Sequence, residues 1–138
     1  MRHIADIVRE QRPVTLPADA SVRTACETMR RRKVGAVLVV DAEDCLIGIF
    51  TGRDAVGRVL ANGLGAETTV LAEVMTEKPR VMAPERPAIE ALRLMQSVGC
   101  RHVPIVDKGK LLGVVSRADF RGLELDRLDE ETQVWDRI

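Results

Sequence analysis

The sequence is poor in aromatic residues, which make up 2% of its 138 residues and include no tyrosine. A protein that stacks single-stranded bases on aromatic rings would lack its contact surfaces. The sequence also has no excess of either charge, since 21 Lys and Arg balance 21 Asp and Glu. Bulk nucleic-acid binding depends on a basic excess that displaces counterions from phosphates. Both shortages argue against a nucleic-acid partner.

Long apolar runs are absent too. No run approaches the roughly 18–20 residues that a membrane-spanning helix needs, and the first six residues contain no apolar signal core. The few cysteines (Cys26, Cys45 and Cys100) and the two histidines show no metal-ligand spacing. With 46% hydrophobic residues the chain has enough apolar surface for a core. We therefore expect a folded cytoplasmic protein with reduced, mostly packed thiols, no metal site and no membrane partner.

The chain repeats itself. Val8 matches Val74 and Met29 matches Met95, each pair 66 positions apart, and after one residue is lost in a turn Asp54 matches Asp119 at 65. We predict two repeats, residues 4–62 and 70–122, followed by a tail at 123–138. The tail mixes apolar and acidic residues, which predicts an amphipathic helix or a pair of turns. We expect it to pack against its own chain and to contribute to a dimer.

Each repeat has the same predicted order of elements. A short helix at 4–9 or 70–75 is followed by an extended piece near 14–15 or 81–82 and by an amphipathic helix. Two short β-rich runs then flank a polar turn, at 37–50 and 103–115, as in a hairpin. A last helix begins at Thr51 or Ser116. The predicted unit is α-β-α-β-β-α, of mixed α/β (α+β) class, and we expect two such units packed sheet to sheet about an approximate two-fold axis.

The most informative pattern occurs once in each repeat, at residues 48–54 and 113–119. Each copy has a glycine, two apolar residues, a hydroxyl residue (Thr51 or Ser116), two variable positions and an aspartate. A hydroxyl residue with an acid three positions later is a helix capping arrangement. A strand-end glycine also lets a ligand approach the backbone, and a helix N-terminus offers N–H groups to an anion. An ionised aspartate there matches the two hydroxyls of a ribose, so capping and nucleoside binding both remain open.

Three features occur together in this sequence: the two motifs, the two amphipathic helices ending in Met, and the run Gly99–Asp107. With these features, residues 4–122 resemble a tandem pair of CBS domains, the modules named after cystathionine β-synthase. The first repeat departs from the pattern, because residues 33–38 lack the proline and the Arg-His pair of the second. The resemblance implies a stand-alone regulatory module that binds an adenosine-containing ligand, AMP, ADP or ATP first, in clefts between the repeats.

By the same resemblance, Asp54 and Asp119 would each hold a ribose. Arginines would bind phosphate, and aliphatic segments would line the adenine slot in place of aromatic rings. The complete set of expected ligand-binding residues is Thr15, Gly35, Ala36, Val37, Thr51, Arg53, Asp54, Val81, Met82, Arg101, His102, Val103, Pro104, Ser116, Arg117 and Asp119.

The resemblance also implies a homodimer and an unknown protein partner that receives a conformational signal. No cofactor is expected to be obligatory; the expected ligand is a regulatory adenine nucleotide. Alternatives are a sensor of NADH or S-adenosylmethionine and a structural dimerisation module whose motifs act only as caps. An enzyme is not expected, because the sequence has no obvious pair of catalytic carboxylates and no activated nucleophile.

Overall fold

A computed structural model describes residues 1–120 of the chain. These residues belong to two compact units. Unit 1 comprises Met1–Gln11, Arg80–Asp107 and residues 112–120, and unit 2 comprises Arg12–Pro79 and Lys108–Leu111. The tail predicted at 123–138 lies outside the described residues.

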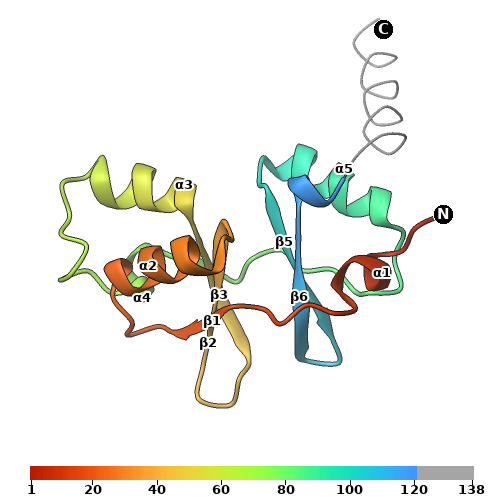
Figure 1. Ribbon diagram of the computed structural model, residues 1–138, viewed down its shortest axis with the longest axis horizontal. Helices are drawn as coiled ribbons and strands as arrows, with labels where there is room; N and C mark the ends of the chain where they lie inside the picture. The colour runs from red at the N-terminus through yellow and green to blue at the C-terminus, as the bar shows by residue number, and fades with distance from the viewer. Residues whose placement is uncertain (121–138) are drawn as a thin grey trace, which may run out of the picture. The chain divides into compact units, whose positions relative to one another are not determined.

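Unit 2 is built on a four-stranded sheet of order β1-β2-β3-β4 (Figure 1). Strands β2 and β3 form the predicted antiparallel hairpin, in which Ala36 lies opposite Thr51. Strand β1 runs parallel to β2, with Thr15 opposite Leu38. The strands are β1 (Thr15–Pro17), β2 (Ala36–Val40), β3 (Leu46–Thr51) and β4 (Thr76–Glu77).

The helices of unit 2 pack on the sheet through an apolar core. Helix α2 starts at Ser21, whose hydroxyl accepts the Thr24 N–H, and ends at Lys33 in the left-handed conformation. The buried face of α2 and every second residue of β2 pack in the same hydrophobic core. This follows from the spacing at which a helix and a strand return side chains to one face. The helices are α2 (Val22–Arg32), α3 (Gly52–Asp54) with its π-helical continuation η1 (Ala55–Leu60), and α4 (Leu71–Val74); the core holds Val14, Val22, Ala25, Met29, Val37, Val39, Phe50, Val59, Leu71 and Val74.

Unit 1 contains a second hairpin and a long helix. Pro87 is the N-cap of helix α5, and Gly99 ends the helix at φ +79°. The first strand of this repeat is reduced to a parallel bridge between Met82 and Ile105. The elements are α1 (Ile4–Val8), α5 (Ala88–Val98), β5 (His102–Asp107), β6 (Lys110–Ser116) and the 3-10 turn η2 (Arg117–Asp119).

The predicted mixed α and β class is confirmed, with one difference in how the repeats contribute. The first helix of each sequence repeat packs in the unit formed mainly by the other repeat. Ile4 and Val8 of α1 join the core of α5, β5 and β6, whereas Leu71 and Val74 of α4 join the core of α2, β2 and β3.

Matched backbone hydrogen bonds fix this exchange. The Ile4 N–H donates to the Arg86 carbonyl at 3.0 Å, and the Leu71 N–H donates to the Ala20 carbonyl at 2.9 Å. Ala20 and Arg86 are 66 positions apart, as equivalent residues of the two repeats are. A further matched pair joins Ala5 to Pro84 and Ala72 to Ala18, at 2.8 and 2.9 Å. Each unit therefore holds the first helix of the other sequence repeat.

The motif glycines have a packing role that the sequence interpretation did not include. A Cβ at Gly113 would lie 2.5 Å from Gln11 Oε1 and 2.9 Å from Val8 Cβ, and one at Gly48 would lie 2.5 Å from Met75 Sδ. The space beside each glycine is filled by the chain segment that carries or follows the exchanged helix. The glycines therefore admit the chain's own residues, and the approach of a ligand to the backbone at this point stays a prediction.

Substitution of Gly113 by alanine tests this packing. We expect Gly113→Ala to lower the free energy of unfolding by about 1–3 kcal/mol, because Val8 Cβ cannot move without shifting α1. Gly57→Ala is the matched control: nothing lies within 4 Å of its added Cβ, so we expect stability to stay the same or rise by about 0.5–1 kcal/mol. Urea unfolding followed by circular dichroism measures both, and equal stability of the two variants would contradict the packing role.

Candidate functional site

The first motif forms a closed corner between β3 and α3. The backbone N–H of Thr51 donates to Asp54 Oδ2 at 2.9 Å, and the Thr51 hydroxyl donates to the same oxygen at 3.1 Å. In return, the Asp54 N–H donates to Thr51 Oγ1 at 3.2 Å. This is a reciprocal capping box. The corner holds the carboxylate against the start of the helix.

The second motif repeats the corner between β6 and η2. The Ser116 N–H donates to Asp119 Oδ2 at 2.7 Å, and the Ser116 hydroxyl lies 3.3 Å from that oxygen. Ser116 and Asp119 are half-buried, and Arg117 is exposed. In both motifs one carboxylate oxygen serves the cap, so the other oxygen is the one offered to a ligand.

A cap of this kind is not by itself a binding site. Helix α1 has the same arrangement, in which the His3 N–H donates to Asp6 Oδ2 at 2.9 Å. That backbone bond, followed by the nearby Arg9 guanidinium, lowers the pKa of Asp6 below its usual value. Asp6 belongs to neither repeated motif. Capping therefore accounts for the acid three residues after the cap, and a ligand role needs further groups near the motif.

In unit 2 such groups come from the start of β2. The Gly52 N–H donates to the Gly35 carbonyl at 3.1 Å, and Ala36 lies opposite Thr51 in the hairpin. Gly35 and Thr15 are exposed, whereas Ala36 and Val37 are buried. Val37 is part of the core, so only its backbone can reach a ligand. The structure thus brings Gly35 and Ala36 to the motif and places Thr15 further along the sheet, opposite Leu38.

The same arrangement recurs in unit 1. The Arg117 N–H donates to the Arg101 carbonyl at 3.1 Å, which is the counterpart of the Gly52–Gly35 bond. His102 is half-buried, Val81 is exposed, and Val103 is a core residue that offers only its backbone. The Met82 N–H donates to the Pro104 carbonyl at 3.1 Å. The expected residues of the second repeat therefore lie along β5 and its parallel bridge.

Pro104 removes one backbone hydrogen bond from the strand pairing of unit 1. Its counterpart in unit 2 is Leu38, whose N–H donates to the Val14 carbonyl at 2.8 Å. Proline has no N–H, so unit 1 lacks this bond. Pro104 lies inside β5 and is buried. A proline within a strand is tolerated at a sheet edge, and the missing donor of Pro104 faces the side of β5 that carries only the short bridge from Met82 to Ile105.

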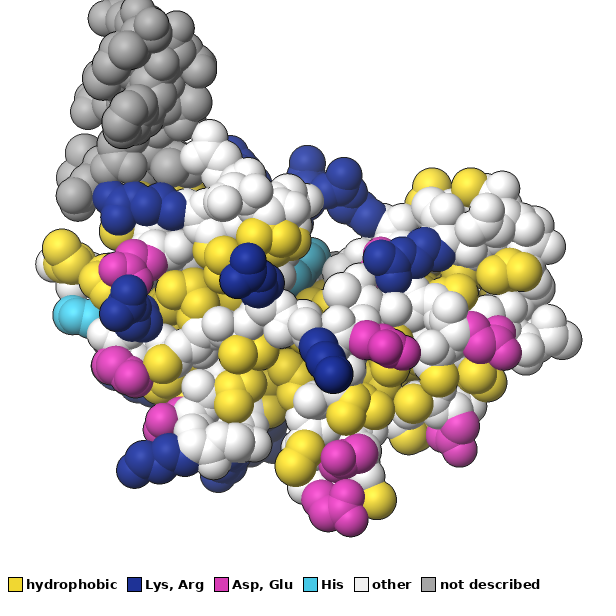
Figure 2. Space-filling view, turned by 180° about the vertical axis from the view of Figure 1, so that it is seen from behind, with side chains coloured by type: hydrophobic (Ala, Val, Ile, Leu, Met, Phe, Trp, Pro, Cys, Tyr) yellow, Lys and Arg dark blue, Asp and Glu magenta, His cyan; other side chains and the backbone are white. Residues whose placement is uncertain are grey.

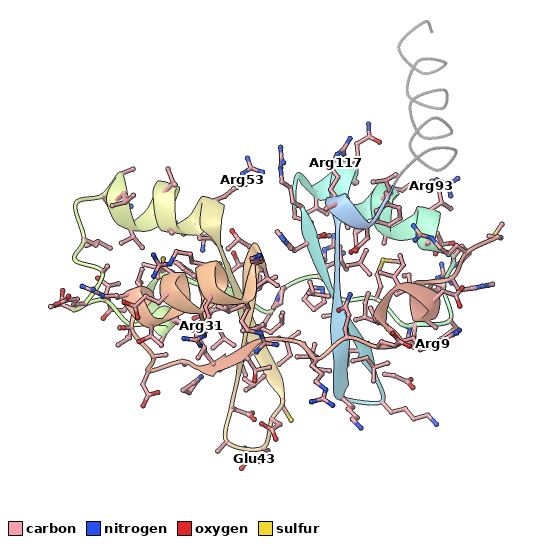
Figure 3. The ribbon with its side chains drawn as sticks, in the orientation of Figure 1. Arg9, Arg31, Glu43, Arg53, Arg93 and Arg117 are labelled. Atoms are coloured by element: carbon pink, nitrogen blue, oxygen red, sulfur yellow. The ribbon has the colours of Figure 1, made fainter. Side chains whose placement is uncertain are left out.

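Two exposed arginines flank the corners. Figure 3 shows the Arg53 and Arg117 side chains extending outward from the elements that follow β3 and β6. They are not equivalent in the repeats: Arg53 matches Ala118, and Arg117 matches Gly52, at the separation of 65. Each motif therefore carries one solvated guanidinium that can bind an anion, but at a different position.

The sequence interpretation missed three side chains at the corners. Arg58 Nε lies 3.6 Å from Asp54 Oδ1, and the i,i+4 spacing is a signal that could have found this ion pair. Arg2 Nη2 donates to the Asp119 carbonyl at 2.8 Å, and Gln11 Oε1 accepts the Val114 N–H at 2.9 Å. The last two join residues more than 100 positions apart, for which one sequence contains no local signal.

A hollow of about 620 Å³ in unit 2 lies at the other end of β1 and β2. Apolar residues line it together with the carboxylates of Asp19, Asp41 and Asp44, and of the expected ligand residues only Thr15 takes part. Asp41 Oδ1 accepts the N–H groups of Glu43 and Cys45 at 2.9 Å and so shapes the hairpin turn. This acidic hollow does not suit the phosphate of a nucleotide.

The remaining chemistry of the described residues is limited. Between residues 1 and 120 no group of three His, Cys, Asp or Glu side chains could hold a metal ion, and no helix there is long and apolar enough to cross a bilayer. All three cysteines are free. Burial raises the pKa of the Cys26 thiol, whereas Cys45 is exposed and so departs from the packed position expected for most of the thiols.

Comparison with known proteins places the motifs in one family. The CBS domain model matches residues 4–61 and 71–126. A CBS domain-containing protein of Arabidopsis thaliana is 34% identical over 111 residues, which cover 80% of this chain and 20% of that protein. The chain thus spans about a fifth of the length of this plant relative.

Solved structures agree. A CBS-domain containing protein from Agrobacterium tumefaciens is 30% identical with a TM-score of 0.76, over 84% of this chain and 91% of that one. A CBS domain protein from Pyrobaculum aerophilum, complexed with AMP, shares the fold at 23% identity and a TM-score of 0.82, over 94% and 99% of the two chains.

The capping role of the first motif can be measured without a ligand. We expect Thr51→Val to lower the free energy of unfolding by about 1 kcal/mol, because the Asp54 N–H loses its acceptor. Thr15→Val, at an exposed position of β1, is the control and should change stability little. Thermal unfolding of the ligand-free protein measures both. A Thr51→Val protein as stable as the parent would show that the corner does not depend on this hydroxyl.

Proposed function

The chain belongs to the CBS domain family and carries the domain twice, and on that premise we propose that it is a regulatory module that binds an adenosine-containing ligand. The observation that supports this proposal most strongly is the doubled corner. Both repeats hold a carboxylate at a strand-to-helix junction with one oxygen used by the cap. The second oxygen can accept hydrogen bonds from the neighbouring hydroxyls of a ribose.

The other parts of a nucleotide also have candidate partners. Exposed guanidiniums at Arg53 and Arg117 suit a phosphate. Adenine would rest on aliphatic side chains and backbone of the neighbouring strands, and Ala36, Met82 and Pro104 supply these near the motifs. The low aromatic content is consistent with such a slot. Glycine at position 35 leaves backbone accessible beside the first motif.

AMP, ADP and ATP are the ligands we propose first, with NADH and S-adenosylmethionine as alternatives. AMP is the natural first probe, since the Pyrobaculum protein of the same fold was solved with it. Such a ligand regulates only if it binds two conformations with different affinity, and a protein partner must sense that difference. We propose that the module is not catalytic and that it acts in the cytoplasm, where its free cysteines stay reduced.

A structural role is the second candidate. Each motif carboxylate is already engaged by its own backbone, as the Asp6 carboxylate is in α1. Caps of this kind would be retained for stability alone. In that case substitution of the aspartates would lower stability and there would be no ligand affinity to lose.

Titration with AMP separates the two candidates. We expect Asp119→Asn to weaken AMP binding at the second motif by about 1.5–3 kcal/mol, because a charged acceptor for the ribose is lost. Asp44→Asn, at an exposed turn position with φ +61° that asparagine also adopts, should leave affinity unchanged. Isothermal calorimetry on ligand-free protein measures both variants. If AMP, ATP, NADH and S-adenosylmethionine all fail to bind the parent protein, the ligand-binding proposal is wrong.

We also propose that two copies of the chain associate through η1 and the residues after it. Val56, Leu60 and Leu64 are 62%, 71% and 42% exposed and recur at a spacing of four. Figure 2 shows hydrophobic side chains at the surface of this unit. Isolated apolar residues are common on surfaces, but this stripe of three, two on η1 and one just after its end, suits a self-complementary contact.

Sedimentation velocity over a range of protein concentrations tests this association. We expect the parent chain to sediment as a dimer and Leu60→Glu to shift it to a monomer, because two carboxylates would face each other in an apolar contact. Val98→Glu, at an exposed position of α5 outside this stripe, should remain a dimer. A monomeric parent, or a Leu60→Glu dimer, would rule out this contact.

A further inference from the structure

The two motif aspartates differ in the group that lies beside the carboxylate oxygen not used by the cap. In unit 2, Asp54 Oδ2 accepts both the N–H and the hydroxyl of Thr51, and Asp54 Oδ1 lies 3.6 Å from Arg58 Nε. Oδ1 is the oxygen that the cap leaves for a ligand. A guanidinium therefore stands beside the atom that would receive the ribose hydroxyls.

Arg58 is held in this place from its other side. Its Nη1 donates to the Val74 carbonyl at 3.0 Å, and Val74 is the last residue of α4. A cation suits the carbonyl end of a helix. The Arg58 side chain is 46% exposed and that of Asp54 is 16% exposed. The guanidinium is thus anchored to α4 while it shares the Asp54 carboxylate.

In unit 1 an arginine contacts the backbone of the motif aspartate and not its carboxylate. The ion pairs found within residues 1–120 include none with the Asp119 carboxylate. Arg2 donates instead to the Asp119 backbone carbonyl, and its guanidinium lies 5.6 Å from the centre of the Phe120 ring. At the separation of 65, Arg58 corresponds to Leu123, which carries no charge.

We propose that Arg58 is a positioning residue that weakens ribose binding at Asp54, so that the Asp119 site has the higher affinity and fills first. This inference rests on the proposed function. To accept two ribose hydroxyls, Asp54 Oδ1 must give up or share the Arg58 guanidinium. An ion pair of this exposure contributes little, so the expected penalty is about two- to fivefold in affinity.

The test isolates the first site. In an Asp119→Asn background we compare Arg58→Gln, which removes the charge and keeps a polar side chain, with Arg58→Leu, the residue of the second repeat. Arg23→Gln is the matched control, because Arg23 loses the same charge and pairs with Glu27 and Glu67, far from Asp54 in sequence. Calorimetric titration uses adenosine, which has the ribose and no phosphate, and 2′,3′-dideoxyadenosine, which lacks both hydroxyls.

The expected result is adenosine affinity about two- to fivefold higher in both Arg58 variants, with no change in Arg23→Gln and no gain for the dideoxy compound. Unchanged or lower adenosine affinity in folded Arg58→Gln would overturn the inference. A gain that the dideoxy compound shares would also overturn it, because the effect would then not pass through the ribose. If the parent chain with both aspartates binds no adenosine compound, the proposed function itself fails, and the inference with it.

Discussion

The turn from strand to helix in each motif depends on one carboxylate that accepts the backbone N–H of the last strand residue. Thr51 and Ser116 would otherwise end their strands with a donor turned away from the ladder. The carboxylate closes that bond and starts the following helical turn. Its orientation is therefore set by the backbone before any ligand arrives, and every group near the corner is arranged around an oxygen whose position is already determined.

The preceding glycines and the exchanged helices depend on the same corners. Gly48 and Gly113 lie three residues before the capping residues, and side chains from the segment carrying or following α4 or α1 occupy the space that a Cβ would need. Bonds from Arg58 to Val74 in unit 2 and from Gln11 to Val114 in unit 1 then tie that segment to the motif region. A glycine that recurs in both repeats can thus serve internal packing within the motif.

Much of the fold follows from local patterns in the sequence. The apolar stripe of α2, the hairpin around Asp41 and the hydroxyl-acid pairs predict their elements, because helix, strand and cap each have a short-range signature. The packing of α1 with the second repeat has no such signature. Its hydrogen bonds join residues about 80 positions apart in sequence, such as Ile4 and Arg86, and depend on the tertiary fold.

The candidate site shows the same division. The motif residues are readable from the sequence, but the side chains that modify them are not: Arg2 reaches Asp119 from the opposite end of the described chain. Burial also decides which atoms of an expected residue remain usable. Val37 and Val103 belong to apolar runs whether they line a ligand site or a core, and only the structure shows that their side chains face the cores.

The exchange of α1 and α4 has a consequence for synthesis on the ribosome. Residues 12–79 supply the sheet, the helices and the core of unit 2, and they emerge as one continuous stretch. The first eleven residues belong to unit 1, whose other elements begin at residue 80. Residues 1–11 therefore acquire their packing partners only after residues 80 onward have been made, and until then the apolar side chains of Ile4 and Val8 lack the core in which they are buried.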